Sequence, residues 1–453
     1  MVYVYDLRSI TDHQVLQRDH DTQGATVDLG NGQERFYATG GPYTVQGKRN
    51  IYVGDVFVMA GQSNMRGHGF YTDPFTGQDE RHSDILGVHV YASNERWTSR
   101  GEPTHRLAES PRRVHHTLPD PTVRNPTLLE VRGASLGLPF AAHYRELIGD
   151  NVPVGLIASA HGGTSIEDWS VERMDEVDDP SQDTLFGAML ARISEAAQNQ
   201  ITAVLWYQGE TDACANTVWS PYGSKFNDLM DAMRSYIRDD LPVYYVQIGR
   251  HVRDDNEVKE RIWSSARQGQ STPILYFPER NQNTAMVASI DCEMDDAIHL
   301  SARGLARVGR RLANAAYKGL QGLAREATPQ IDSIMYEERR KSAGVVVRSF
   351  LVRFRYMHGE RWQTVSLVQG FTLHRRGEGK DDLLPLIYSA RIESDQSVRL
   401  FLTTSAKDWT EETLLLSYGY GKNPTCNLVT TSDRALLAYS ASARVGSNNV
   451  IQC

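Results

Sequence analysis

The chain has 453 residues, of which 40% are hydrophobic and 23% charged, as is usual for a folded domain and unlike a disordered chain. The formal net charge of −8 argues against nucleic-acid binding as the main role, because such proteins carry a basic surface. No apolar run of about 18 residues occurs, so we expect no membrane-spanning helix.

Residues 1–50 have the pattern of short strands and turns, and we expect a small β appendage there. Alternation at residues 25–29 favours a strand, while the glycines at 30–32 and 40–42 are typical of turns. Residues 1–6 lack the basic and then apolar pattern of a signal peptide. We therefore expect a cytoplasmic protein or part of a phage particle, or a secreted protein whose leader is absent from this sequence; the compartment stays open.

Residues 51–322 alternate between short apolar runs and longer mixed segments, which favours an α/β fold with a parallel sheet and helices on both sides. Strands are predicted at 56–60, 88–91, 154–158, 203–207, 243–246 and 286–290. Helical spacing predicts helices at 140–147, 186–197, 226–237 and 301–320. Within this catalytic unit, the Pro- and Arg-rich stretch 103–126 is expected to form a long surface loop.

Residues 329–453 return to a β-like pattern and predict a C-terminal β-rich accessory domain. Strands are expected at 344–347, 350–354, 398–402 and 414–418. The role of this domain stays open between glycan binding, assembly and a packed accessory unit. The four cysteines, Cys214, Cys292, Cys426 and Cys453, form no C-x-x-C pair, so we expect free thiols and no structural zinc site.

The first motif that points to chemistry is Gly-Gln-Ser-Asn-Met at residues 61–65, directly after the predicted strand 56–60. Its glycine permits a tight turn, so Ser63 is presented at the rim of the sheet, where a nearby base can make a serine hydroxyl a nucleophile. A polar turn after a strand is the plain alternative for this pentapeptide alone.

The second motif is Asp-Ala-Ile-His-Leu at residues 296–300, between the last predicted strand and the last predicted helix of the unit. Asp296 stands three residues before His299. This spacing lets the carboxylate hold the imidazole in the tautomer that a general base needs. Taken alone, a capping aspartate and a surface histidine explain the motif as well.

Two more motifs follow predicted strands. In His-Gly-Gly-Thr, the paired Gly162 and Gly163 let backbone N–H groups approach a ligand closely, although a plain strand-to-helix turn has the same pattern. In Trp-Tyr-Gln-Gly-Glu, Gln208 can present its amide to a developing oxyanion. Glu210 is either a partner behind the reacting groups or a solvated loop acid.

A fifth motif, Gly-Ala-Ser-Leu-Gly at residues 133–137, matches the G-x-S-x-G pattern of α/β-hydrolase nucleophiles. The residues before it do not form a convincing buried strand and Pro139 follows at once, so we do not expect Ser135 to be the nucleophile. The other four motifs each follow an apolar run of one β/α series. This predicts that they share one rim of the same sheet.

Together these blocks resemble the SGNH hydrolase superfamily, and within it the sialate O-acetylesterase-like branch of carbohydrate esterases. The resemblance rests on four blocks in order, at residues 61–65, 162–169, 206–210 and 296–300, and it covers about residues 15–320. It implies a three-layer α/β/α fold with a flavodoxin-like parallel sheet. It also implies Ser63 as nucleophile, His299 as base and Asp296 as the carboxylate that orients it.

The oxyanion hole implied by the resemblance consists of the Ser63 N–H, the Gly163 N–H and the Gln208 side chain. Gly162 stays open as the alternative backbone donor. The wider superfamily usually has Asn in this third block, so Gln208 departs from it but fits the branch. The implied reaction hydrolyses O-acetyl esters on sialic acid or another acetylated glycan through an acetyl-serine, with no metal or organic cofactor.

Two alternatives stay open. One is the same chemistry on xylan or a bacterial surface glycan, as in a phage tail deacetylase. The other is a carbohydrate-binding protein that lost catalysis, against which the intact Ser63, Asp296 and His299 argue. The expected partner is an acetylated sugar or polysaccharide, with no nucleic acid; the oligomeric state cannot be inferred from the sequence.

Overall fold

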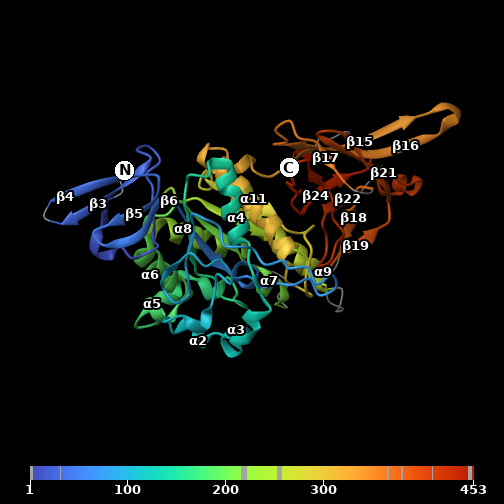
Figure 1. Ribbon diagram of the computed structural model, residues 1–453. Coiled ribbons are helices and arrows are strands. Elements are labelled where there is room, and N and C mark those ends of the chain that lie inside the picture. Colours follow the sequence, from blue (N-terminus) through green and yellow to red (C-terminus); the bar gives the residue numbers. More distant parts are fainter. Residues whose placement is uncertain are drawn as a thin grey trace.

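The computed structural model describes residues 4–30, 32–215, 222–252, 258–364, 367–378, 381–410, 412–446 and 451–452. Three parts follow one another along the chain (Figure 1): an N-terminal β unit in blue, a central α/β unit, and a C-terminal β unit in orange and red. No helix in these ranges combines the length and the apolar character needed to cross a bilayer.

The central sheet has the strand order β14-β13-β12-β6-β11-β8-β9. The strands are β6 (Lys48–Gly61), β8 (Val88–Tyr91), β9 (Trp97–Thr98), β11 (Val154–Ala158), β12 (Ala203–Tyr207), β13 (Val243–Gln247) and β14 (Thr284–Ala288). All neighbours pair in parallel except β9, which is antiparallel to β8. The predicted parallel sheet is confirmed, and its six strands lie within two residues of their predicted ends or inside a longer strand.

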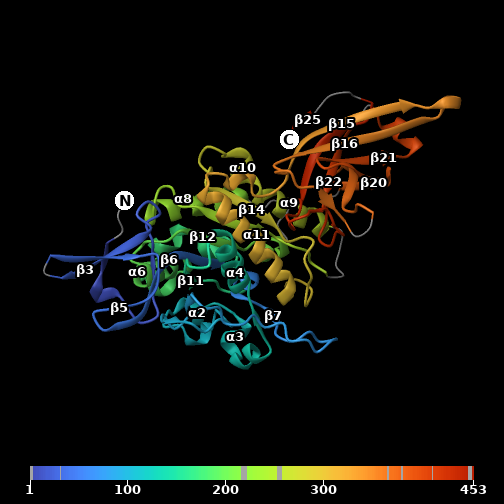
Figure 2. The same cartoon turned by 45° about the horizontal axis from the view of Figure 1, so that its top comes forward.

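Helices cover both faces of this sheet, as expected for three layers. Helices α4 (Gly137–Ile148) and α11 (Ala302–Leu320) contact each other on one face, as Figures 1 and 2 show. Helices α6 (Leu185–Ala197) and α8 (Tyr222–Tyr236) contribute to the core on the other face. Strand β6 serves both cores, because successive side chains of a strand point to opposite faces: Phe57 and Met59 join the first core.

The remaining helices of the central unit are short, apart from α9. They are α1 (Ser63–Arg66), α2 (Val114–Thr117), α3 (Pro121–Arg124), α5 (Pro180–Asp183), α7 (Glu210–Cys214), α9 (Val258–Gln270) and α10 (Thr272–Tyr276). Two short strands, β7 (Gly69–Phe70) and β10 (Arg132–Ala134), pair with each other. Helix α9 was not predicted, because its sequence is mostly polar and only a few residues, such as Trp263, enter the core.

The stretch 103–126 is not the long surface loop that we expected. It contains α2 and α3, and its polar side chains His105, His115 and Asp120 are almost fully buried. Asp120 caps α3 by accepting a hydrogen bond from the Thr122 N–H. Charged and polar residues indicate a surface only when they lack partners inside, and here they pair with residues from other segments: His105 with the Ala160 N–H, His115 with His161, and Asp120 with Arg66.

The N-terminal unit contains a three-stranded sheet, β1-β3-β4, and two strands that pair with the first part of β6. Its strands are β1 (Val4–Asp6), β2 (Val15–Gln17), β3 (Gly24–Gly30), β4 (Gln33–Ala38) and β5 (Gly40–Val45). The segment 40–42, expected as a turn, lies within β5. Strand β6 crosses the predicted boundary at residue 50, so this unit is continuous with the central sheet.

The C-terminal unit is β-rich, with a five-stranded sheet, β20-β21-β16-β15-β25, and a four-stranded sheet, β19-β18-β22-β24. Its strands are β15 (Gln330–Arg340), β16 (Val346–Arg355), β17 (Trp362–Gln363), β18 (Phe371–Arg376), β19 (Asp381–Leu384), β20 (Ile387–Ser394), β21 (Ser397–Leu402), β22 (Thr413–Tyr418), β23 (Val429–Thr430), β24 (Tyr439–Arg444) and β25 (Ile451–Gln452). The strand expected at 344–347 begins only at Val346, after a short helical turn at Ser342–Gly344, and it continues through the strand expected at 350–354.

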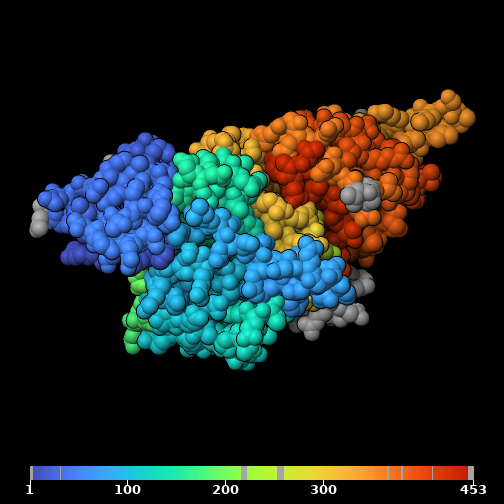
Figure 3. Space-filling model, viewed as in Figure 1, coloured from blue at the N-terminus to red at the C-terminus, as the bar shows by residue number. Residues whose placement is uncertain are grey.

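This unit packs directly against the central unit, next to α11 in gold (Figure 3). The buried guanidinium of Arg267 on α9 donates to the carbonyls of Gly419 and Gly421 in the C-terminal unit and to two carbonyls after β13. Free thiols are confirmed for Cys292 and Cys426, while Cys453 lies outside the described residues.

Candidate active site

The four predicted motifs lie at the carboxyl end of the parallel sheet. The first follows β6, the second follows β11, the third follows β12, and the last lies in the irregular segment 289–301 between β14 and α11. Strands β11, β6 and β12 are neighbours, with Met59 opposite both Ala158 and Leu205, so the loops that follow them emerge side by side. Strand order thus brings together side chains more than 200 positions apart.

A tight turn after β6 presents Ser63. Gly61 has φ +130°, and a Cβ there would lie 2.2 Å from the Tyr207 carbonyl oxygen, so only glycine fits where the end of β6 lies beside the end of β12. The Gln62 N–H then bonds the same carbonyl at 2.8 Å, and α1 begins at Ser63. The serine hydroxyl is held by backbone geometry at the start of a helix.

Ser63, His299 and Asp296 form a connected chain of hydrogen bonds. His299 Nε2 is 2.9 Å from Ser63 Oγ, and His299 Nδ1 is 2.8 Å from Asp296 Oδ2. With its proton on Nδ1, the ring donates to the carboxylate and leaves Nε2 free to accept from the serine. Burial opposes ionisation of Asp296, but hydrogen bonds from the His299 ring and from two backbone N–H groups lower the pKa of this carboxyl well below its usual range.

Asn64 ties the turn of the serine to the loop of the histidine. Its Nδ2 donates to Glu210 Oε1 at 2.7 Å and to the carbonyl of the residue before His299 at 3.3 Å. Its Oδ1 accepts from the N–H of the residue after His299 at 3.0 Å. Burial raises the pKa of Glu210 to about 7. We had given Asn64 no role, although its place next to Ser63 in the motif was a signal.

Two backbone N–H groups on the loops that follow the neighbouring strands β6 and β11 are open. Within the described ranges, no hydrogen bond engages the N–H of Ser63 or that of Gly163. Gly163 is exposed and has φ +73°, whereas Gly162 is buried against a carboxylate: a Cβ there would lie 2.2 Å from Asp120 Oδ2. Asp120 is in turn paired with the buried Arg66 at 3.2 Å. Of the two glycines, Gly163 is the accessible one.

The Gln208 amide faces the same loop but is already engaged. Its Nε2 donates to the Asp212 carboxylate at 2.6 Å and to the Thr164 carbonyl at 2.9 Å, next to Gly163. An amide has only two hydrogens, so both are used in this arrangement. Gln208 therefore holds the Gly163 loop, and it reaches a ligand only by giving up one of these bonds.

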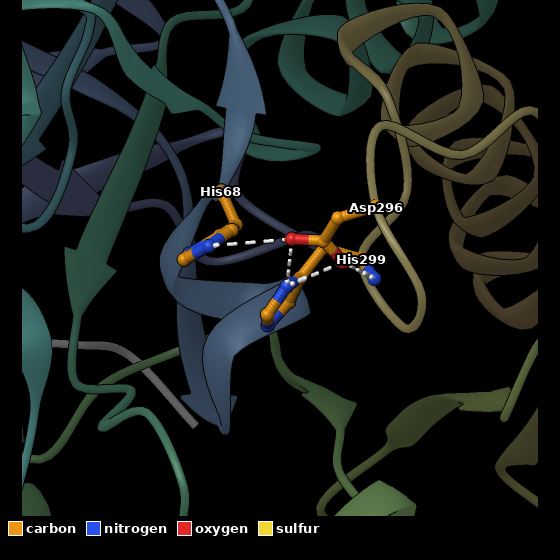
Figure 4. A group of neighbouring side chains, drawn as sticks. All are labelled: His68, Asp296 and His299. Atoms are coloured by element: carbon orange, nitrogen blue, oxygen red, sulfur yellow. Dashed lines mark hydrogen bonds and ion pairs between the residues drawn. The ribbon is translucent and has the colours of Figure 1, made fainter. Parts of the chain in front are cut away.

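His68 is a group that the sequence analysis missed. Its ring stacks on the His299 ring with centroids 3.6 Å apart and planes 27° apart, and its Nε2 is 3.9 Å from Asp296 Oδ2 (Figure 4). Arg66 Nη2 lies 2.9 Å from His68 Nδ1, and Arg132 Nη1 contacts His68 Nε2. The fold brings residues 68 and 299 together from distant parts of the chain, so no local sequence pattern predicts this contact.

His68, Asp296 and His299 also offer possible metal ligands, with atoms within 4.8 Å of one another, and they are the one such group in the described part of the chain. Two guanidinium groups against the His68 ring disfavour a further cation there. His299 also uses both ring nitrogens for Ser63 and Asp296. These residues fit one another better than they fit a metal, and the absence of a metal stays a prediction.

Ser135, which we did not expect to be the nucleophile, and Asp295, the neighbour of Asp296, both make structural contacts. Ser135 is fully buried, and its N–H donates to Glu102 at 2.7 Å. Asp295 Oδ2 accepts from the Phe70 N–H at 2.7 Å, which fixes the histidine loop to β7. Neither contacts the hydroxyl of Ser63.

Comparisons with known proteins agree with this architecture. The family described as "carbohydrate esterase, sialic acid-specific acetylesterase" matches residues 53–318. A probable carbohydrate esterase from Arabidopsis thaliana is 27% identical over 208 residues, which cover 43% of this chain and 68% of that protein. The crystal structure of a carbohydrate acetylesterase from Xanthomonas citri matches with a TM-score of 0.63 and 20% identity, covering 95% of this chain and 98% of that one.

The architecture is therefore that of the SGNH hydrolases, a three-layer α/β/α fold that here carries β units at both ends. The chain belongs to the carbohydrate esterase family of sialic acid-specific acetylesterases, and it is a carboxylic ester hydrolase.

Proposed function

We propose that the protein is a serine carbohydrate O-acetylesterase, which hydrolyses O-acetyl esters on a sugar through an acetyl-serine. The observation that carries the proposal is the unbroken contact from Ser63 Oγ through the His299 ring to Asp296. Family membership supports an acetylated sugar as the substrate. Asp296 and Gly163 are partly exposed, so a bulky sugar has access to this edge of the sheet.

In the first half of the reaction, Ser63 Oγ attacks the acetyl carbonyl carbon while His299 Nε2 takes the hydroxyl proton. The carbonyl oxygen becomes an oxyanion, and the open N–H groups of Ser63 and Gly163 donate to it. The bond between the carbonyl carbon and the sugar oxygen then breaks. His299 returns its proton to that oxygen, so the sugar leaves as an alcohol and the acetyl group stays on Ser63.

The second half repeats these steps with water. His299 takes a proton from the water as its oxygen attacks the acetyl carbon, and the proton passes to Ser63 Oγ as the ester bond breaks. Acetate leaves and the enzyme is restored. Asp296 keeps the proton of His299 Nδ1 in place and stabilises the imidazolium in both halves.

The test compares the wild type with Ser63→Ala on p-nitrophenyl acetate and on a panel of acetylated sugars, with released acetate as the readout. We expect the variant to keep the fold, judged by circular dichroism, and to lose nearly all turnover. An acid quench of the wild type should trap an acetyl group on the peptide that contains Ser63. Turnover by Ser63→Ala close to that of the wild type contradicts the serine mechanism.

A further inference from the structure

The histidine that acts as base in the proposed mechanism rests against a second, buried histidine. His68 follows α1 directly, its side chain is almost fully buried, and its ring lies over the His299 ring at 3.6 Å between centroids. The two planes differ by 27°, which is a stacked arrangement. Figure 4 shows the His68 ring on one side of Asp296 and the His299 ring below the same carboxylate.

The groups around His68 keep it neutral. Arg66, on α1, and Arg132, on β10, each place a guanidinium group against one of its ring nitrogens, and a neutral ring can accept a hydrogen bond from only one of them. The His299 ring covers its face. Asp296 is the one acid that the structure records beside it, and its Oδ2 is 3.9 Å away, beyond hydrogen-bond range. Burial and these neighbouring cations lower the pKa of His68 to about 2.

We propose that His68 is a positioning residue for His299: its neutral ring is the plane on which the catalytic imidazole rests. This proposal depends on the proposed serine mechanism. The plane prevents rotation of the His299 ring away from the line between Ser63 and Asp296. An uncharged π face also favours the imidazolium that forms during the reaction, and it separates that imidazolium from Arg132.

The choice of a neutral ring follows from the local charge. An aliphatic side chain in place of His68 fills some of the space but presents no π face to the imidazolium. It also leaves two guanidinium groups close to a cation that forms in the transition state, where like charges repel. The expected cost therefore falls on kcat, because the imidazolium exists only along the reaction path and not in the bound ground state.

The experiment measures kcat, KM and the pH dependence of kcat/KM on an acetylated sugar or p-nitrophenyl acetate. For His68→Phe, which keeps the flat ring, we expect kcat within about threefold of the wild type. For His68→Leu we expect kcat to fall about tenfold with KM unchanged. The acidic half-point of its kcat/KM profile should move to lower pH, because the imidazolium is less well stabilised.

Two further variants keep the test decisive. His68→Gln retains a hydrogen-bonding group for the arginines without a ring, so it replaces His68→Leu if that variant does not fold, and we expect the same tenfold loss of kcat. His89→Leu is the matched control, since His89 is another buried histidine that stacks on a histidine ring. It lies on β8 of the central sheet, and its ring faces that of His13 in the N-terminal unit with centroids 5.9 Å apart. This substitution should lower the thermal midpoint and leave kcat unchanged.

The outcomes separate the two proposals. Wild-type kcat and pH profile in folded His68→Leu, or equal losses in His68→Phe and His68→Leu, overturn the positioning role while Ser63→Ala remains inactive. Turnover in Ser63→Ala overturns the serine mechanism itself, whatever the His68 variants do. A lower thermal midpoint without a change in kcat shows a purely structural role for His68 and rejects the proposal.

Discussion

A cluster of paired charges connects the C-terminal β unit to the start of the histidine loop, and Asp433→Asn tests it. Asp433 accepts from Arg307 Nη2 at 2.6 Å and from Arg311 Nη2 at 2.8 Å. The same two arginines bind Asp291, the third residue after β14, at 2.6 and 2.7 Å. Arg311 Nη1 also donates to the carbonyl of Ala288 at 2.8 Å. The exposed Glu293 also lies 3.5 Å from Arg307 Nη1, so two cations meet three anions where the catalytic loop begins.

The loss of stability expected for Asp433→Asn follows from the burial of the charges that it leaves behind. Arg311 is only 3% exposed and Asp291 5%, so removal of the Asp433 carboxylate leaves two arginines that share one buried carboxylate, with only the exposed Glu293 beside Arg307. Breaking a buried ion pair from one side costs about 3–5 kcal/mol, and because Asp433 itself is 33% exposed we take about 2 kcal/mol. At about 2–4 °C per kcal/mol for a domain of 150–250 residues, we expect the thermal midpoint to fall by about 4–8 °C.

The assay pairs thermal unfolding with kcat on an acetyl ester. Asp382→Asn is the matched control in the same unit, because Asp382 pairs with Arg375 at the surface, where both side chains are more than 40% exposed and such pairs contribute at most about 1 kcal/mol. If the catalytic loop depends on the cluster, Asp433→Asn also lowers kcat below the unfolding temperature. An unchanged midpoint in Asp433→Asn, or the same small shift in both variants, refutes the reasoning.

Two more predictions follow from side chains around the site. Gln208→Ala should lower kcat about tenfold, because its amide holds the Gly163 loop through Thr164; a loss of 10²–10³, as for a direct oxyanion donor, would show instead that the amide leaves Asp212 during the reaction. Stability should fall as the pH drops from about 6.5 toward 4. Burial lowers the pKa of His105 to about 3 and of His161 to about 4, so the unfolded chain binds protons in this window that the folded chain does not. The free energy of unfolding falls by about 1.4 kcal/mol per histidine and pH unit in this window. We expect a lower urea midpoint at pH 5 than at pH 7.5, and equal midpoints would contradict the prediction.

The sequence predicted those parts of the fold that local patterns encode. Buried parallel strands are continuous apolar runs, and reactive loops follow such strands, so the sheet and the loops of Ser63 and His299 were readable. Helix α9 and the buried stretch 103–126 were not predicted. Both are polar, and contacts with residues far away in the sequence hold them in position. His68 was missed for the same reason: its ring contacts His299, which lies 231 positions further along the chain.

The histidine loop explains why these long-range contacts are essential to the site. Residues 289–301 form no helix or strand, and the backbone holds His299 only through an isolated bridge, in which the Asp295 N–H bonds the His299 carbonyl at 3.0 Å. Hydrogen bonds from other segments hold the loop. Asn64 bonds the backbone of both neighbours of His299, and the Phe70 N–H bonds the Asp295 carboxylate. The Val252 N–H bonds the Ala297 carbonyl at 2.7 Å. Each anchor comes from a different segment, and the cluster at Asp433 adds one from the C-terminal unit. Loss of a local anchor, such as the side chain of Asn64, should therefore loosen the base and lower kcat before it lowers stability, whereas loss of the buried charge at Asp433 lowers stability as well.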